Sequence, residues 1–215
     1  MKSVAKLHFI ITAGGTREYI DPVRFITNAS SGKMGLALAE AAQKAGHKVT
    51  LITTIQAQSV IPAKAGIQKI IFVETADEMF KAVKKCFRQC DCLIMAAAVS
   101  DYTPAKVSKN KLKKTNKNLT IRLKPTVDIL KWAGNNKKKN QIIVGFALED
   151  RNLKTNAEKK LKQKNLDMII ANAPSAIGEK KSTAYIKRIN KGWILLKNSN
   201  KTDIAKKIIK LTMPD

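Results

Sequence analysis

Short apolar runs recur along the chain, and most are followed by a longer stretch in which apolar residues repeat every three or four positions. Runs of the first kind predict buried strands, and stretches of the second kind predict amphipathic helices. Strands that alternate with helices form a mainly parallel sheet with helices on both faces, so we expect an α/β, Rossmann-like three-layer sandwich. The strands are expected at residues 8–11, 47–53, 69–73, 91–99, 119–123, 141–149 and 167–171.

Helix signals and the carboxyl-terminal pattern complete this outline. Residues Thr75 to Glu78 form a capping box at the start of one helix, and residues 155–164 form another. Two alternating runs flank Asn190-Lys191-Gly192 and predict a hairpin, and a last helix is expected from Thr202, its cap, to Leu211. We therefore expect one domain over residues 1–215, ending in a hairpin and a helix.

The most informative stretch is residues 10–35, IITAGGTREYIDPVRFITNASSGKMG. Gly14 and Gly15 predict a tight turn after the first strand, and Ser30 or Ser31 can cap a helix whose free N–H groups attract an anion. Glycines before a helix often mark only a tight connection. A P-loop is excluded because Thr27 stands where it needs glycine, and a G-x-G-x-x-G fingerprint is excluded by the long separation.

Other candidates lie at predicted strand ends, where open α/β sheets bind ligands. Asp101 follows the alanine-rich end of one strand and can accept a hydrogen bond, although it can also cap the turn before Pro104. Phe146 can stack on a base at the end of another strand or belong to the core. Lys160 and Lys164 are spaced to share one helical face.

Composition narrows the function classes. Of the 215 residues 44% are hydrophobic, the formal charge is +25, and the aromatic fraction of 5% includes no residues interleaved with the lysine runs. Base stacking needs such aromatics, so a solvated lysine-rich surface is favoured over nucleic-acid binding. No apolar run is long enough to span a bilayer, and we expect a cytoplasmic protein. Cys86, Cys90 and Cys92 are expected to be reduced and to pack in the core.

Two motifs resemble a known family. ITAGGTREYIDPVRFITNASSGKMGLALAEAA and AAAVSDYTPA are similar to signatures of phosphopantothenoylcysteine synthetase, also called phosphopantothenate-cysteine ligase. This is the synthetase half of the bacterial bifunctional coenzyme A biosynthesis protein. The similarity continues through KLKK (111–114) and KPTVDIL (124–130) and covers nearly the whole chain, with departures at Val127 and Ala173.

The resemblance implies a ligase that joins 4'-phosphopantothenate to L-cysteine. CTP would activate the carboxylate as an acyl-cytidylate, and the products would be 4'-phosphopantothenoyl-L-cysteine, CMP and pyrophosphate. It also implies Mg²⁺, a homodimer and a separate flavin-dependent decarboxylase, because the chain shows no decarboxylase half. We expect neither nucleic acid nor membrane as a partner.

The resemblance also assigns residues. Lys111 would stabilise the activation step, Asn28 would hydrogen-bond the acyl carbonyl, and Arg24 would bind substrate or order its loop. No metal ligand is assigned. The residues expected to bind the nucleotide or its phosphates are Gly14, Gly15, Thr16, Ser30, Ser31, Gly32, Lys33, Gly35, Met95, Ala96, Ala97, Asp101, Lys111, Lys124, Pro125, Thr126, Val127, Phe146, Lys160 and Lys164.

Two other function classes stay open at this stage. An NAD(P)-dependent Rossmann oxidoreductase would share the fold, but Thr53 and Thr54 stand where an acidic ribose contact is usual. A basic nucleic-acid-binding module would show an affinity that falls steeply with salt. The choice of CTP over ATP follows from the resemblance alone.

Overall fold

The computed structural model describes residues 6–55 and 67–213, and its centre is an eight-stranded sheet. Six neighbouring strands are parallel, and two antiparallel strands extend the sheet at one side. The expected mainly parallel sheet is confirmed. In spatial order the strands are β12 (Trp193–Asn200), β11 (Lys181–Arg188), β10 (Met168–Asn172), β9 (Ile142–Leu148), β6 (Cys92–Met95), β1 (His8–Ala13), β4 (Lys48–Thr53) and β5 (Lys69–Phe72).

The order of the strands creates a switch point beside β1. The chain runs from β1 outward through β4 and β5 and then returns to β6 on the other side of β1. In open α/β sheets, connections at such a point diverge and leave a crevice at the carboxyl ends of the strands. The fold therefore provides a place for a ligand between the ends of β1 and β6.

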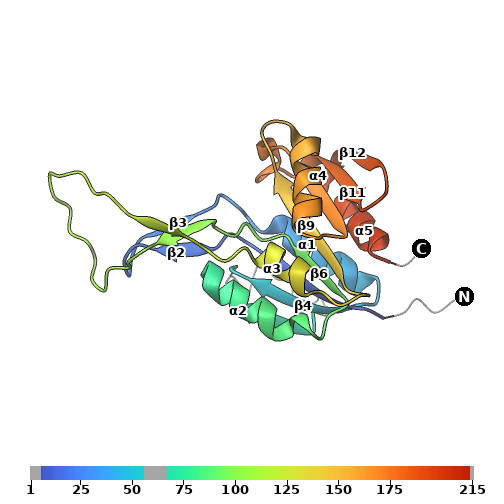
Figure 1. The fold of residues 1–215 in the computed structure, drawn as a ribbon, viewed down its shortest axis with the longest axis horizontal. Helices are drawn as coiled ribbons and strands as arrows, with labels where there is room; N and C mark the ends of the chain where they lie inside the picture. Colours follow the sequence, from blue (N-terminus) through green and yellow to red (C-terminus); the bar gives the residue numbers. More distant parts are fainter. Residues whose placement is uncertain (1–5, 56–66, 214–215) are drawn as a thin grey trace, which may run out of the picture.

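Helices cover both faces of the sheet, which confirms the three-layer sandwich (Figure 1). Phe9 and Ile11 pack in the apolar cluster under α1 (Lys33–Lys44) and α5 (Lys201–Leu211), whereas Ile10 packs in the second cluster on the opposite face. Neighbouring residues of a strand point to opposite faces, so the uniformly apolar β1 sequence fits burial on both sides. The helices over the second cluster are α2 (Ala76–Phe87), α3 (Ile129–Asn136) and α4 (Leu153–Gln163).

Two of the predicted helix caps are wrong and one is confirmed. Thr75 accepts a hydrogen bond from the Glu78 N–H, and Glu78 accepts one from the Thr75 N–H, as a capping box requires. Helix α1 is preceded by Gly32 at φ 69°, where glycine is free of side-chain strain, and neither Ser30 nor Ser31 caps it. The cap of α5 is Asn200, two residues before the predicted Thr202, because the helix begins at Lys201.

An arm projects from the body of the molecule and was not predicted (Figure 1). It consists of two antiparallel pairs, β2 (Arg17–Tyr19) with β3 (Phe25–Thr27) and β7 (Tyr102–Pro104) with β8 (Leu123–Pro125). The loop 105–122 forms its far end. The strand predicted at 119–123 is wrong. Most of that segment is exposed, and Leu119 is 62% exposed. Its alternating apolar residues therefore have no core to pack against, and the segment does not form a strand.

Several smaller predictions can be compared with the described residues. The carboxyl-terminal hairpin is confirmed, and its turn contains Asn190 in the left-handed conformation. Cys86, Cys90 and Cys92 are free and buried, and burial raises the pKa of Cys90 to about 12. The suspected insertion near Pro62 lies outside the described residues. Among the described helices, none is both long and apolar enough to cross a bilayer.

Candidate active site

A cavity of about 530 Å³ lies where β6, β9 and β10 end and α1 begins. This volume falls in the range of small-molecule sites. Its wall combines segments that are far apart in sequence, including many of the residues predicted to bind a nucleotide. The predicted residues on the wall are Asn28, Ser30, Ser31, Gly32, Lys33, Met95, Ala96, Ala97, Asp101, Thr126, Val127, Phe146, Lys160 and Lys164.

Two glycine segments meet behind the wall at the start of α1. Gly14 adopts φ 90°, and a Cβ at this position would lie 2.1 Å from Thr54 Oγ1. A Cβ on Gly32 would lie 3.0 Å from the Gly14 nitrogen. Gly35 approaches β1 closely, because a Cβ there would lie 2.5 Å from Ala13 Cβ. Gly14 and Gly35 therefore support the wall and are not part of its lining.

The loop after β6 is held in place by the turn after β1. The Thr16 N–H donates to the Ala98 carbonyl, and Thr16 Oγ1 accepts from the Ser100 N–H at 3.0 Å. Gly15 forms an isolated bridge with Ala98. Asn28 Nδ2 also donates to the Ala98 carbonyl, at 3.2 Å. Thr16 and Gly15 thus position the loop that carries Asp101, and Asn28 lies where β1 and β6 diverge.

One basic corner of the cavity contains Lys160 and Lys164. Lys160 Nζ donates to the Phe146 carbonyl at 2.8 Å, whereas Lys164 pairs with Asp128 at 2.7 Å. Burial, followed by the charge of Lys164, lowers the pKa of Lys160. Burial is the largest single influence on Asp128 and would raise its pKa, but the hydrogen bonds from Lys164 and the Lys131 N–H, with the charges of the two lysines, together lower it.

Asp128 also caps α3, because its carboxylate accepts a hydrogen bond from the Lys131 N–H at 2.9 Å. Its carboxylate is therefore committed to Lys164 and to the helix. Lys160 forms no ion pair within the described residues. The half-buried ring of Phe146 can stack on the face of a base, and the Lys160 ammonium group can donate to the polar edge of that base.

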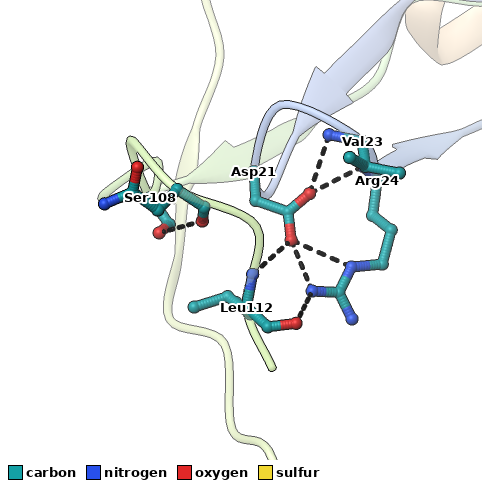
Figure 2. A network of polar contacts seen from close by, with 6 residues as sticks. Asp21, Val23, Arg24, Ser108 and Leu112 are labelled. Atoms are coloured by element: carbon teal, nitrogen blue, oxygen red, sulfur yellow. Dashed lines mark hydrogen bonds and ion pairs between the residues drawn. The ribbon is translucent and has the colours of Figure 1, made fainter. Parts of the chain in front are cut away.

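Arg24 and Lys111 lie on the arm, outside the cavity wall. Figure 2 shows the buried Asp21 carboxylate accepting hydrogen bonds from the N–H groups of Val23, Arg24 and Leu112 and from the Arg24 guanidinium. Arg24 also donates to the Leu112 carbonyl at 2.7 Å. These contacts, led by the Arg24 guanidinium, hold the pKa of Asp21 well below its usual range.

Of the two roles expected for Arg24, the structure shows contacts that order the loop. They fix Leu112, the neighbour of Lys111, while Lys111 itself is exposed. Lys124 and Pro125 belong to β8 and also lie outside the wall. Most of the predicted residues therefore line the cavity or lie on the arm, and Gly14, Gly15, Thr16 and Gly35 lie behind the wall and support it.

The carboxylates on the wall are compatible with a metal that arrives with phosphates. In the described parts of the chain, no three His, Cys, Asp or Glu side chains form a cluster that could hold a metal ion. Mg²⁺ often takes only one or two protein carboxylates together with phosphate oxygens and water. Asp101 on the cavity wall can supply such a ligand.

Sequence reasoning missed the wall segments near the carboxyl terminus. They come from the end of β10, the turn that follows it, the start of β11 and the start of α5. The pattern gave these residues no chemical signal, because it only predicted a strand, a hairpin and a helix. They are Asn172, Ala176, Ile177, Gly178, Ser182 and Lys201.

A family model, described as the DNA/pantothenate metabolism flavoprotein C-terminal domain, matches residues 4–213. The chain belongs to this family. The resemblance to the bifunctional coenzyme A biosynthesis protein is confirmed by a Bacillus subtilis relative and by a crystal structure.

The Coenzyme A biosynthesis bifunctional protein CoaBC of Bacillus subtilis (strain 168) is 48% identical over 171 residues, which are 80% of this chain and 41% of that protein. A Cysteine/Cysteine sulfinic acid decarboxylase from an unknown prokaryotic organism is 50% identical over 163 residues, 76% of this chain and 45% of that protein. The chain thus matches less than half the length of either relative.

The fold agrees with a solved member of the family. The crystal structure of the C-terminal domain of CoaBC has a TM-score of 0.80 and 36% sequence identity, and the match covers 98% of this chain and 96% of that one. The Rossmann-like architecture described above is therefore the architecture of this C-terminal domain.

Proposed function

We propose that the chain is a phosphopantothenate-cysteine ligase that uses CTP. The cavity carries this proposal, because it gathers Asn28, the start of α1 and the end of β6 around one space. These are the segments for which the family resemblance implies substrate and nucleotide contacts. The match to the C-terminal domain of CoaBC supports the same assignment.

The reaction requires activation because a carboxylate has no good leaving group. In the first step the carboxylate of 4'-phosphopantothenate attacks the α-phosphate of CTP, forming a P–O bond while the bond to pyrophosphate breaks. In the second step the amine of cysteine attacks the acyl carbon, a C–N bond forms, and CMP leaves. The amine gives up its proton, and the product is the amide.

Residues around the cavity can serve the first step. The free N–H groups at the start of α1 bind phosphate oxygens, as helix N-termini do. Lys111, brought in by the arm, offsets the charge that builds as pyrophosphate leaves. Mg²⁺, when bound to the triphosphate, would supply further charge neutralisation, with Asp101 as its protein ligand. Phe146 and Lys160 would receive the cytosine.

Asn28 would serve the second step. Its side chain already donates one N–H to Ala98, which fixes its orientation, and an amide nitrogen carries a second N–H. That group would donate to the acyl carbonyl as negative charge develops on it, an oxyanion-type contribution of about 3 kcal/mol.

We also propose that the protein is a homodimer and that the arm forms the interface. The arm exposes apolar side chains, and such patches mark association sites. A flavin-dependent decarboxylase is proposed to act next in the pathway. The exposed apolar residues of the arm are Val23, Phe25, Tyr102, Val107, Leu119 and Leu123.

Pyrophosphate release tests the ligase directly. Purified protein is supplied with 4'-phosphopantothenate, L-cysteine, Mg²⁺ and either CTP or ATP. We expect substrate-dependent release with CTP. Asn28→Ala should still form the acyl-cytidylate but make roughly hundredfold less amide, as loss of one oxyanion donor predicts.

The control is Asn135→Ala, at an exposed position near the end of α3 that does not line the cavity, and it should match the wild type. Absence of pyrophosphate release with both nucleotides, from folded protein, would reject the ligase. Retained nicotinamide cofactor or salt-sensitive nucleic-acid binding would then favour the alternatives.

A further inference from the structure

A second basic corner of the cavity lies on the other face of the sheet from Lys160. It contains Lys33 and Lys201, the first residues of α1 and α5. Lys33 Nζ donates to the Gly178 carbonyl, and Lys201 Nζ donates to the Ala176 carbonyl, both at 3.3 Å. Two ammonium groups thus approach the same short turn from two different helices.

This arrangement is electrostatically unfavourable in the absence of a ligand. A helix N-terminus carries partial positive charge, so a lysine at its first position is repelled by the helix dipole. Helix α1 has no acidic residue in its first turn, and α5 has Asp203. Within the described residues neither Lys33 nor Lys201 forms an ion pair.

The two lysines also act on each other. Burial, followed by the charge of Lys33, lowers the pKa of Lys201, and Glu179 opposes this shift from nearby. Carbonyl groups, which are neutral, are the hydrogen-bond partners of both ammonium groups. The corner therefore holds positive charge that an anion would neutralise.

A buried hydroxyl group in the same corner has an unfilled hydrogen-bonding capacity. Ser182 is only 8% exposed and lines the cavity, and its Oγ has no hydrogen-bond partner in the described part of the chain. Ser182 pairs with Ser199 of β12 in the hairpin, and Ser199 comes two residues before Lys201 in the chain. A buried hydroxyl usually has a partner. Because Ser182 lines the same cavity as the two lysines, a ligand bound there can be that partner.

We propose that Lys33, Lys201 and Ser182 form a subsite for a phosphoryl group of one of the reactants. The proposal rests on the proposed function for the identity of those reactants. Two phosphoryl groups have the required chemistry: the terminal phosphates of the nucleotide and the phosphate of 4'-phosphopantothenate. Both are multiply charged anions that accept hydrogen bonds from ammonium and hydroxyl groups.

Equilibrium binding to the full chain, measured by calorimetry, distinguishes the two sources. The ligands are CTP, CMP, inorganic pyrophosphate, 4'-phosphopantothenate and pantothenate, which lacks the phosphate. The variant is Lys201→Met, which keeps most of the side-chain length without the charge. The matched control is Lys210→Met, an exposed lysine on the same helix.

If the subsite holds the nucleotide, Lys201→Met weakens the binding of CTP and of pyrophosphate by roughly tenfold to hundredfold and leaves the affinity for CMP unchanged. If the subsite holds the acid substrate, Lys201→Met weakens the binding of 4'-phosphopantothenate by a similar factor and leaves the affinity for pantothenate unchanged. Ser182→Ala should weaken the same ligand by a smaller factor, and Lys201→Arg should restore most of the binding.

A Lys201→Met variant that binds every ligand as Lys210→Met does would overturn the proposal. Thermal unfolding of each variant shows whether it is folded. The subsite can survive failure of the ligase assignment: wild-type protein that binds pyrophosphate but releases none from CTP would reject the ligase. Weaker pyrophosphate binding by Lys201→Met would then still support the subsite.

Discussion

At the scale of single residues, Asp21 connects two segments that are remote in sequence. Its carboxylate accepts from two N–H groups of its own turn, from Arg24 and from the Leu112 N–H, ninety-one positions away along the chain. All of these contacts favour the ionised carboxylate. The contact between the β2–β3 turn and the loop at the far end of the arm therefore depends on the charge of one buried side chain.

Asp21 should make stability depend on pH in a defined direction. Its folded pKa lies below the unfolded value of about 3.9, so its contribution is complete above that value and declines as the pH falls through it. We expect the wild type to exceed Asp21→Asn in free energy of unfolding at pH 7 and the difference to shrink between pH 5 and pH 3. Urea unfolding across this range measures it.

Asp150→Asn, at an exposed position, is the control and should leave the pH profile of the wild type unchanged. A difference between wild type and Asp21→Asn that stays constant from pH 7 to pH 3 would contradict the assigned role.

At the residue scale, local sequence motifs pointed to several residues that line the cavity, and their chemical roles stay predictions. Ser30 to Lys33, Asp101 and Phe146 all lie on the cavity wall. Lys201 was missed because its place on the cavity wall depends on the packing of α5 beside α1, a contact between distant parts of the chain. The partnership of Asp21 with Leu112 was missed for the same reason.

At the scale of elements, the position of α1 depends on its close approach to β1. A Cβ on Gly35 would lie 2.5 Å from Ala13 Cβ and 2.7 Å from the Thr12 carbonyl oxygen, both too close for a real side chain. The helix start and the strand end are thereby fixed relative to each other. This contact sets the location of the N–H groups that are proposed to bind phosphate.

Gly35→Ala should displace α1 from β1. We expect a loss of about 1 to 3 kcal/mol in the free energy of unfolding, the usual cost of overpacking, together with weaker CTP binding. Gly192→Ala is the matched control, because a Cβ there meets nothing within 4 Å. Equal denaturation midpoints for the two variants would show that α1 tolerates the added methyl group.

Element-scale prediction was best for long periodic segments. The parallel strands, the capping box of α2 and the carboxyl-terminal hairpin follow from local patterns and are confirmed. The strands of the arm have three residues each, too few for a periodic signal, and they pair only within a structure already built by the sheet. The cap of α1 was misplaced because backbone conformation at Gly32 replaced a side-chain cap.

At the scale of the whole molecule, the arm carries apolar surface away from the core. Leu119 is 62% exposed and Tyr102 is 56% exposed. Light scattering should give twice the chain mass of 23.7 kDa. The double variant Leu119→Ser with Leu123→Ser should shift the protein toward the monomer, because it removes apolar area from the proposed interface.

The control is Leu195→Ser, which changes a leucine of similar exposure on β12, outside the arm. A double variant that stays dimeric while remaining folded would place the interface elsewhere. A monomeric wild type at micromolar concentration would reject the homodimer.

The arm is built from segments that are distant in sequence, and this affects the order in which the chain folds. Its two hairpins come from segments separated by α1, β4, β5, α2 and β6. Contacts between such distant segments require closure of a long loop, and this entropic cost delays them. The sheet strands β1 and β6 must meet before β2 and β7 can touch. Newly made chains should therefore bury their core early and position the Lys111 segment last, so compaction precedes completion of the proposed active site.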